Sequence, residues 1–402
     1  MKKTKVSVGI IVLLTLVFVS VPSFAQQVLK IGSFNPLTGP AASWGVNVDR
    51  VTDMCAEEWN KKGGVTVKGQ KYKIELIHED DKYRGEEGVK AINKLIFTDK
   101  VKFIVGPLAG SSVLATQPIS EANKIIMFCN PYLGPEIFKN KLYTFRVSVP
   151  LFHTSLPFFK FLTKRFPELK TSVHLAPNHA SGWACTQADN DAWDALGFKV
   201  LATEFFEPTT QDFTAQITRL LALKPDFISL GGTSGGNAAM IIKQTRELGY
   251  KGKIVHAGIF AYTEVGSIAG WENIEGMVCA TFSIEGPACP PRVKELGARF
   301  VEKYKDEGGF SQGGNTFDAL NLLLWGMEKA NSLDSEQVLK GIENLGEINS
   351  ITGKAHLGGQ EFYGIKRQLF SPFMISEIRN RRLITVGLEM PLEVPPPEKK
   401  WR

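Results

Sequence analysis

The feature that most constrains this chain is a regular alternation between short apolar runs and amphipathic stretches with the period of a helix. It starts at residues 28–50, where the strand-like run LKIGSF leads into a loop rich in Pro and Gly and then into a helical pattern. A buried strand, a loop and a helix start form the first half of a βαβ unit. Repeated units of this kind build a mostly parallel sheet with helices on its faces, so we expect an α/β fold.

The alternation falls into two series, one ending near residue 148 and the other running over 152–283. A chain of 402 residues is long enough for two domains with separate cores. Two series of domain size therefore predict two lobes, each with its own sheet. Three helical patterns follow without strands between them (292–309, 315–331 and 335–346), and we expect them to cover a sheet that is already complete.

The first 25 residues have the pattern of a secretory signal peptide. Three lysines precede an apolar run over 6–19, and Pro22, Ser23 and Ala25 follow where a signal peptidase would read the chain. The apolar run is too short to span a bilayer comfortably. We therefore expect cleavage near Ala25 and export of a soluble protein to the periplasm, with an uncleaved N-terminal anchor as the alternative.

Composition argues against several classes of protein. Hydrophobic residues make up 43% of the chain and charged residues 22%, as in ordinary globular domains, so extensive disorder is not expected. The formal net charge is +6, and removal of the three lysines in the predicted signal peptide lowers it by three, to +3. A charge this small, spread along the chain, does not favour nucleic-acid binding.

The cysteines do not predict a metal site. They lack CxxC pairs and metal-like spacing with His, so we expect neither a metal nor a cofactor. Cys279 and Cys289 are the closest pair, and an oxidising compartment would allow them to form a disulfide. Five buried thiols that act as small hydrophobic side chains fit the sequence equally well. The cysteines are Cys55, Cys129, Cys185, Cys279 and Cys289.

Several segments, taken in their order and spacing, resemble one known family. They are IGSFNPLTGPAASWG, AEEWNKKGGV, IELIHEDD, VKFIVGPLAGSSVLATQPIS, NPYLGPE, QDFTAQITRLLALKPDFISLGG and NTFDALNLLLWGMEKA. The chain resembles the periplasmic solute-binding proteins of branched-chain amino-acid ABC transporters, the Leu/Ile/Val-binding type. The resemblance implies the type I periplasmic binding fold, in which two α/β lobes joined by crossover strands close around a small amino-acid-like or carboxylate solute. It also implies a monomer that is not an enzyme and that serves the permease and ATPase subunits of an importer.

The resemblance implies that the chain passes between the lobes more than once. One lobe would comprise residues 26–147 and 284–360, and the other 148–283 and 361–390. The remaining tail, 391–402, is rich in Pro and charge, and we expect it to be extended or disordered.

The family's ligand contacts, carried over position by position, fall on loops that follow predicted strands. The aromatic residue of the first loop falls on Trp44, and a serine segment after the third strand would face a ligand carboxylate with hydroxyl and amide groups. The implied contacts are Trp44, Ala109, Gly110, Ser111, Ser112, Pro131, Leu133, Ser181, Gly182, Thr233 and Phe260.

Three departures from the family pattern bear on the ligand. Leu133 stands where amino-acid binders usually have a threonine, and Ser181 replaces a tyrosine. The segment 257–262 lacks the acid that pairs with a ligand ammonium, and an ammonium buried without a partner is costly. We therefore expect an aromatic or other apolar carboxylate, or an amide, in preference to leucine or valine.

An alternative keeps the family's usual amino-acid ligand. Glu264 lies shortly after the segment that lacks the acid, and Asp80 and Asp81 end a strand of the other lobe. Any of these three carboxylates could pair with the ammonium.

Two other functions stay open. Gly232–Gly236 reads GTSGG, which matches the G-x-S-x-G nucleophile elbow, and Ser234 is followed by Asp318 and His356 in the order of a secreted serine hydrolase. No oxyanion motif precedes it. A ligand-sensing receptor domain of the same fold is the other alternative.

The run 78–81, HEDD, lacks the spacing of a metal motif and is better explained as a solvated strand end.

Overall fold

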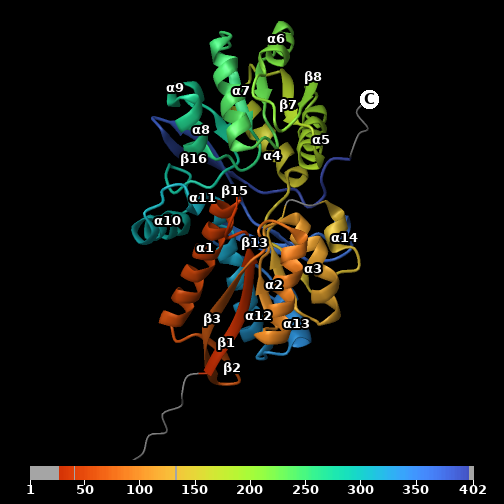
Figure 1. The fold of residues 1–402 in the computed structure, drawn as a ribbon, viewed down its shortest axis with the longest axis vertical. Coiled ribbons are helices and arrows are strands. Elements are labelled where there is room, and N and C mark those ends of the chain that lie inside the picture. The colour runs from red at the N-terminus through yellow and green to blue at the C-terminus, as the bar shows by residue number, and fades with distance from the viewer. Residues whose placement is uncertain (1–26, 40, 132–133, 398–402) are drawn as a thin grey trace, which may run out of the picture.

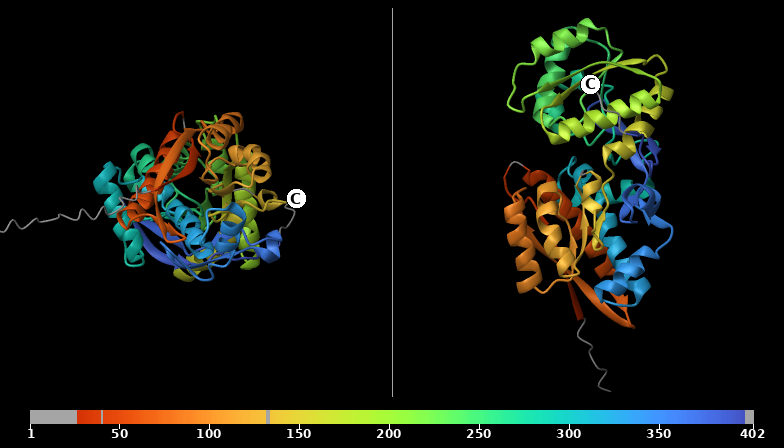
Figure 2. Two further views of the ribbon diagram at one scale, coloured as in Figure 1. Left: turned by 90° about the horizontal axis from the view of Figure 1, so that it is seen from below. Right: turned by 90° about the vertical axis from the view of Figure 1, so that its right-hand side faces the viewer.

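The computed structural model describes residues 27–39, 41–131 and 134–397, and the predicted signal peptide lies outside them. The described chain forms two lobes along the long axis of the molecule, and each lobe has a sheet flanked by helices (Figure 1, Figure 2). The predicted α/β fold with two mostly parallel sheets is confirmed.

The first sheet has nine strands in the order β12-β13-β14-β6-β5-β4-β1-β3-β2. Its centre is parallel, since β1 pairs with β3 and β4, and β4, β5 and β6 follow in parallel. Every residue of β4, β5 and β6 is buried, as expected for parallel strands with both faces covered. The strands are β1 (Gln27–Asn35), β2 (Val65–Val67), β3 (Gln70–Asp80), β4 (Phe103–Val105), β5 (Ile126–Cys129), β6 (Thr144–Arg146), β12 (Ile348–Ser350), β13 (Gly353–Gly358) and β14 (Gln368–Phe370).

The second sheet has seven strands in the order β16-β15-β11-β10-β9-β7-β8. Strands β7 to β11 pair in parallel, and the two C-terminal strands add an antiparallel edge. The strands are β7 (Thr171–Pro177), β8 (Lys199–Phe206), β9 (Phe227–Ser229), β10 (Lys253–His256), β11 (Val278–Cys279), β15 (Phe373–Arg379) and β16 (Arg382–Glu389).

Helices cover both faces of each sheet (Figure 1). The three late helical patterns do cover the first sheet, because Leu320 and Val338 pack in one core with Phe128. The first lobe contains α1 (Ala42–Lys61), α2 (Gly85–Asn93), a π-helical turn (Lys94–Thr98), α3 (Gly110–Ala122), a 3₁₀ turn (Pro135–Phe138), α10 (Pro291–Tyr304), α11 (Phe310–Gly313), α12 (Thr316–Ala330), α13 (Ser335–Glu343) and α14 (Gln360–Tyr363). The second lobe contains α4 (Leu151–Arg165), α5 (Ala180–Ala195), α6 (Thr214–Ala222), α7 (Gly235–Glu247), α8 (Tyr262–Ala269) and α9 (Trp271–Ile274).

The chain changes lobe after β6, after β11 and after β14. The last of these crossings does not lie where it was predicted. Residues 361–390 were expected in the second lobe, so the predicted crossing lay near residue 360. Strand β14 instead pairs with β6 and β13 in the first sheet, and Gln368 accepts a hydrogen bond of 2.6 Å from Arg146 Nε. A short strand has no sequence signal that says which sheet it joins, so only the structure places this boundary after Phe370.

All five cysteines are free thiols. Cys279 is buried in β11, whereas the Cys289 sulfur lies 3.3 Å from the carbonyl oxygen of Ser283 in its own loop. The disulfide between Cys279 and Cys289, one of the two alternatives allowed by the sequence, is therefore absent.

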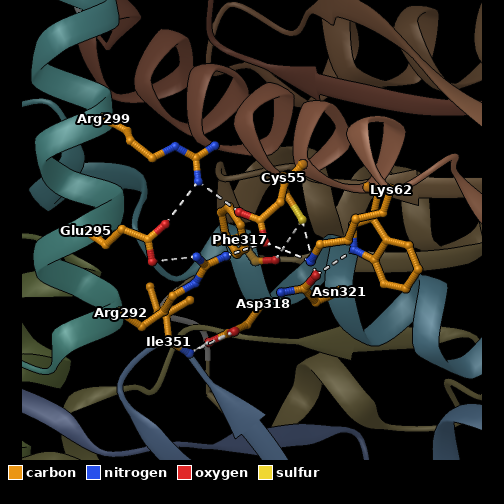
Figure 3. Close-up of polar contacts among 11 residues, drawn as sticks. Cys55, Lys62, Arg292, Glu295, Arg299, Phe317, Asp318, Asn321 and Ile351 are labelled. Carbon is orange, nitrogen blue, oxygen red and sulfur yellow. Dashed lines mark hydrogen bonds and ion pairs between the residues drawn. The ribbon is translucent and has the colours of Figure 1, made fainter.

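A cluster of polar contacts joins α1, α10 and α12 in the first lobe (Figure 3). Asp318 of α12 is 2% exposed, and both of its carboxylate oxygens lie within 3.3 Å of the backbone nitrogen of Ile351. Burial raises the pKa of Asp318 to about 7, and the nearby Arg292 opposes this shift. The folded protein therefore holds a proton on Asp318 over a range in which the unfolded chain has released it.

This raised pKa makes stability depend on pH. Between about pH 4 and pH 7 the folded state binds the extra proton, so the free energy of unfolding should fall as pH rises. Asp318→Asn keeps an oxygen for the Ile351 N–H but cannot ionise. The melting temperature of the variant, relative to the wild type, should therefore increase from about pH 5 to about pH 8.

The matched control is Asp212→Asn, because a hydrogen bond from Thr214 lowers the pKa of Asp212 at an exposed site. Its melting-temperature difference from the wild type should stay constant over the same pH range. A constant difference for Asp318→Asn as well would show that Asp318 is ionised in the folded protein.

Candidate functional site

A cleft of about 610 Å³ lies between the two lobes. Its walls are loops and helix starts at the carboxyl ends of parallel strands, which is where open α/β sheets bind ligands. The first lobe contributes Ala41, Trp44, Tyr83, Leu108, Gly110 and Asn130. The second lobe contributes Leu151, Pro177, His179, Cys185, Pro208, Gly232, Thr233, Ser234, Gly235, Asn237, His256, Gly258, Ile259, Phe260 and Ala261.

Four of the predicted contacts line this cleft. Trp44 and Gly110 lie on the first lobe, and Thr233 and Phe260 lie opposite them on the second. Trp44 is half-buried at the start of α1, and Phe260 is 2% exposed in the loop after β10. The structure thus brings together residues more than 200 positions apart in the chain, Trp44 and Phe260, because loops of both lobes meet at the cleft.

The predicted serines do not turn their hydroxyls into the cleft. Ser111 Oγ lies 3.5 Å from the carbonyl oxygen of Tyr83, and Ser112 Oγ lies 3.4 Å from that of Arg84. Both hydroxyls therefore face the loop before α2, and the start of α3 presents its backbone to the cleft at Gly110.

The other predicted residues lie next to the cleft or outside the described structure. Ala109 is buried as the N-cap of α3, and Pro131 is buried with its carbonyl accepting a hydrogen bond from Ser148. At Gly182, a Cβ atom would lie 2.0 Å from the carbonyl oxygen of Pro177, so this position needs glycine for close backbone approach. Leu133 lies outside the described residues, as does the side chain of Ser181.

Two histidines of the cleft were missed by sequence reasoning. His256 is 4% exposed, its Nδ1 lies 3.3 Å from the Gly258 nitrogen, and its Nε2 lies 3.4 Å from the Thr233 carbonyl oxygen. Burial lowers the pKa of His256, so the ring is neutral, and its Nδ1 also lies 3.1 Å from the carbonyl oxygen of Gly258. His179 Nδ1 accepts a hydrogen bond from the Gly182 nitrogen. His256 is the last residue of β10, in the segment KIVHAG. A histidine at the carboxyl end of a predicted strand is the sequence signal that could have placed it at the cleft.

The starts of the helices differ between the two walls. Helices α1 and α3 begin after alanines, Ala41 and Ala109, which have no side chain that can cap a helix. Helices α5 and α7 are capped by His179 and Ser234, which accept hydrogen bonds from backbone N–H groups in the first turn. Within the described residues, no acceptor is bonded to the N–H groups of positions 110–112. The first-lobe wall therefore has unpaired donors facing the cleft at Gly110.

Thr233 has an unpaired polar atom on the opposite wall. Its side chain is 8% exposed, and its Oγ1 has no hydrogen-bond partner within the described structure. A buried hydroxyl without a partner is unfavourable by about 1–3 kcal/mol. Rotation about χ1 exchanges Oγ1 with the methyl group, so the hydroxyl can turn toward a bound molecule.

None of the described residues that line the cleft is Asp, Glu, Lys or Arg. Glu264 is exposed on α8, and a Cβ at Gly235 would lie 2.5 Å from its Oε2, so its carboxylate borders the cleft at the start of α7. Asp80 accepts hydrogen bonds from Leu37 N and Lys82 N. Asp81 accepts one from Tyr83 N. Of the three acids suggested by the sequence, two lie beside a residue of the cleft wall: Glu264 beside Gly235, and Asp81 beside Tyr83.

The model of the periplasmic binding protein family matches residues 28–380 of this sequence. The chain belongs to this family. The Leu/Ile/Val-binding protein BraC3 of Rhizobium johnstonii is 26% identical over 338 residues, which cover 83% of this chain and 88% of that protein.

Solved structures share the fold. A leucine-binding protein from Thermotoga maritima superposes with a TM-score of 0.73 at 24% identity, covering 91% of this chain and 99% of that one. An ABC-transporter solute-binding protein from R. palustris, in complex with benzoate, superposes with a TM-score of 0.71 at 16% identity, covering 93% and 98%. The resemblance seen in the sequence is thus confirmed at the level of family and fold.

This periplasmic binding protein does not assemble the suggested hydrolase triad. Ser234 donates a hydrogen bond of 2.9 Å to Asn237, Asp318 bonds to the Ile351 nitrogen, and His356 contacts Glu393 at 2.6 Å. Asp318 and His356 belong to the first lobe, whereas Ser234 caps α7 in the second. The match to G-x-S-x-G reflects a strand, a glycine loop and a helix N-cap, so the triad hypothesis was wrong.

The HEDD run does not form a metal site either. His78 contacts Asp49 and Asp53, each at 2.9 Å. Burial alone would lower the pKa of His78, but these two carboxylates raise it to about 10, so the ring is a cation that joins β3 to α1. Within the described ranges, no group of three potential ligands could hold a metal ion.

No described helix has the length and apolar character needed to cross a bilayer.

Ser234→Ala should affect stability and not catalysis. Loss of an N-cap hydroxyl should lower the free energy of unfolding by about 0.5–2 kcal/mol. Ser234→Thr, which keeps the hydroxyl, is the matched control and should be close to the wild type. Chemical denaturation measures the first effect, and p-nitrophenyl ester assays test for hydrolysis. Wild-type turnover that disappears in Ser234→Ala but survives in Ser234→Thr would contradict this assignment.

Proposed function

We propose that the chain is the extracytoplasmic substrate-binding protein of an ABC importer and carries a small organic carboxylate in the cleft between its lobes. Family membership supports the binding role, and relatives with this fold bind amino acids or benzoate according to their names. The observation that carries the proposal is the uncapped start of α3, whose N–H groups meet the cleft at Gly110. Such a helix start binds anionic oxygen atoms.

The mechanism is hinge closure. The ligand carboxylate docks on the N–H groups of α3, and the ligand body packs against Trp44. The second lobe then closes and covers the ligand with Phe260 and Thr233, which excludes water. The ligand stabilises the closed form by the difference between its affinities for the closed and the open form.

The walls favour a ligand with one acidic end and an uncharged body. The lining combines the aromatic groups of Trp44, Tyr83 and Phe260 with uncharged polar groups. Aromatic ligands gain buried area and favourable ring geometry in such a cleft, and its volume suits one small molecule. An aromatic or apolar carboxylate, or an amide, is therefore proposed in preference to leucine. The competing ligand is an amino acid whose ammonium reaches Glu264, or an acid of the other lobe such as Asp81.

The remaining parts of the proposal concern the cell. After cleavage near Ala25, the protein would act as a monomer in the periplasm and deliver its ligand to a membrane permease driven by ATPase subunits. The periplasmic binding protein family supports a site of action outside the cytoplasm. No covalent step is needed, so the protein is proposed not to be an enzyme.

Gly110→Pro should weaken binding of the ligand carboxylate. Proline is well tolerated at the first position of a helix, and Ala109 has φ −72° and ψ 124°, which suits a residue before proline. The change removes one N–H donor, and loss of a hydrogen bond to a charged group is worth roughly 1.5–3 kcal/mol, so the dissociation constant should rise about ten-fold or more.

Gly110→Ala is the matched control, because it adds a methyl group but retains the N–H. Affinities come from calorimetric titration, and melting temperatures verify that both variants fold. Equal affinity in the proline and alanine variants would remove this N–H from the site.

Calorimetric titration with 4-hydroxybenzoate and with leucine tests the ligand class. The proposal expects saturable binding of the aromatic acid and at least ten-fold weaker binding of leucine, since about 1.4 kcal/mol separates them for each factor of ten. Tight leucine binding that is lost in Glu264→Gln would show that Glu264 holds an ammonium and that the family's usual ligand is kept.

A further inference from the structure

The segment after the last strand returns from the second lobe to the junction between the lobes. Strand β16 ends at Glu389 in the second sheet, and the chain then passes between α4 and α14 (Figure 1). The sequence predicted an extended or disordered tail, and residues 391–397 indeed form no helix or strand. Residues 390–393, called the strap below, are nevertheless held by side chains and backbone of both lobes.

The strap is bound to the second lobe at Leu392. The Leu392 nitrogen donates a hydrogen bond of 2.9 Å to the carbonyl oxygen of His153, in the first turn of α4. In return, His153 Nδ1 lies 2.5 Å from the carbonyl oxygen of Leu392. Two reciprocal hydrogen bonds fix this residue to the helix.

The next residue is bound to the first lobe. Glu393 Oε1 lies 2.6 Å from His356 Nε2 on β13, and its Oε2 accepts a hydrogen bond of 3.1 Å from the nitrogen of Gly359, the N-cap of α14. A Cβ at Gly358 would lie 2.5 Å from Glu393 Oε2, so the carboxylate occupies space that any other residue would fill. Two consecutive residues are therefore bonded to different lobes.

His153 connects the strap to the interior of the first lobe. A carbonyl oxygen only accepts, so Nδ1 carries the hydrogen that faces Leu392 and Nε2 accepts from the Tyr363 hydroxyl at 2.6 Å. The Tyr363 oxygen in turn accepts from Arg146 at 2.6 Å. Burial, with the positive charge of Arg146, lowers the pKa of His153 to about 3, so the neutral ring is the form that makes these bonds. The chain of contacts thus runs from the strap through α4 to β6.

Few other polar contacts oppose movement of the lobes. No hydrogen bond joins described cleft residues of the first lobe to those of the second. The lobes are therefore held together at the crossings after β6, β11 and β14, by the contacts of α4 with α14 at His153–Tyr363 and Phe152–Phe362, and by the strap. Contacts at a hinge decide which interlobe arrangement is populated, because they are kept or broken when one lobe rotates.

We propose that residues 390–393 form an interlobe strap that restricts hinge rotation and thereby sets the balance between open and closed cleft. The strap has a consequence for affinity only if the proposed function holds, since a protein whose binding-competent arrangement is a minor population binds its ligand more weakly. The restriction of rotation itself needs no ligand.

The test measures the distance between the lobes in ligand-free protein. Spin labels on Lys90→Cys of α2 and Lys243→Cys of α7 report this distance by pulsed electron resonance, since both positions are exposed and lie on different lobes. The half-buried Cys185 and Cys289 are replaced by alanine in every sample, so that labels attach only where intended.

Three variants act on the strap in different ways. A chain that ends at Glu389, the last residue of β16, removes the strap. Glu393→Gln weakens the bonds of the strap to the first lobe, and Gly358→Ala displaces the Glu393 carboxylate. Glu347→Gln is the control, because it breaks an exposed ion pair with Lys354 inside the first lobe. The shortened chain should broaden the distance distribution about two-fold, the two point variants less, and the control not at all.

If the shortened chain has a native circular dichroism spectrum and an unchanged distance distribution, the proposal that the strap restricts hinge rotation is wrong. If the shortened chain does not fold, the two point variants decide. Distance distributions in both that are identical to that of the control would equally contradict the strap proposal. Because no ligand is present, either result leaves solute binding untouched. Conversely, if the calorimetric titrations detect no ligand binding, the proposal that the strap restricts hinge rotation is unaffected.

Discussion

The proposed binding site depends on a helix start whose first N–H groups have no bonded acceptor in the described structure. An alanine N-cap in place of Ser or Asp makes a helix less stable by about 1 kcal/mol, and α1 and α3 both begin this way. The two facing helices, α5 and α7, carry side-chain caps. The caps of the second wall each bond one N–H, at Gly182 and Asn237, whereas none of the three N–H groups at positions 110–112 has a bonded acceptor in the described structure. This difference supports the proposal that a ligand carboxylate docks on the first wall.

The neutral second wall follows from the same physics. Burial keeps His256 uncharged, the cysteine thiol of Cys185 stays protonated because burial raises its pKa to about 12, and the wall has no acid among its described lining residues. A ligand ammonium would have to reach past Gly235 to the exposed Glu264, or past Tyr83 to the buried Asp81. Closure onto an uncharged ligand body carries a smaller desolvation penalty than closure onto a charge without a partner. The absence of charge among the described lining residues therefore supports the proposed preference for a ligand with an uncharged body.

The sequence predicted what periodicity and loop chemistry control. Alternating runs predicted both parallel sheets, and the family resemblance, carried onto loops after strands, implied that Trp44 and Thr233 lie in different lobes. Periodicity could not tell that β14 joins the first sheet, because three-residue strands carry no such information. It could not show that Ser111 turns its hydroxyl toward Tyr83, since rotamers depend on neighbours distant in sequence. The strap was hidden because a Pro-rich tail resembles disordered sequence until its partners are known.

The central claim is that this chain closes around a small carboxylate and gains stability from it. The most direct measurement is the melting temperature of the mature protein across a panel of amino acids, amides and aromatic acids. A ligand that binds only the folded state raises stability by about 2.7 kcal/mol at a hundred times its dissociation constant. The account predicts a saturable increase with at least one carboxylate, larger for an aromatic acid than for leucine. Flat melting temperatures across the whole panel, with folded protein, would contradict it.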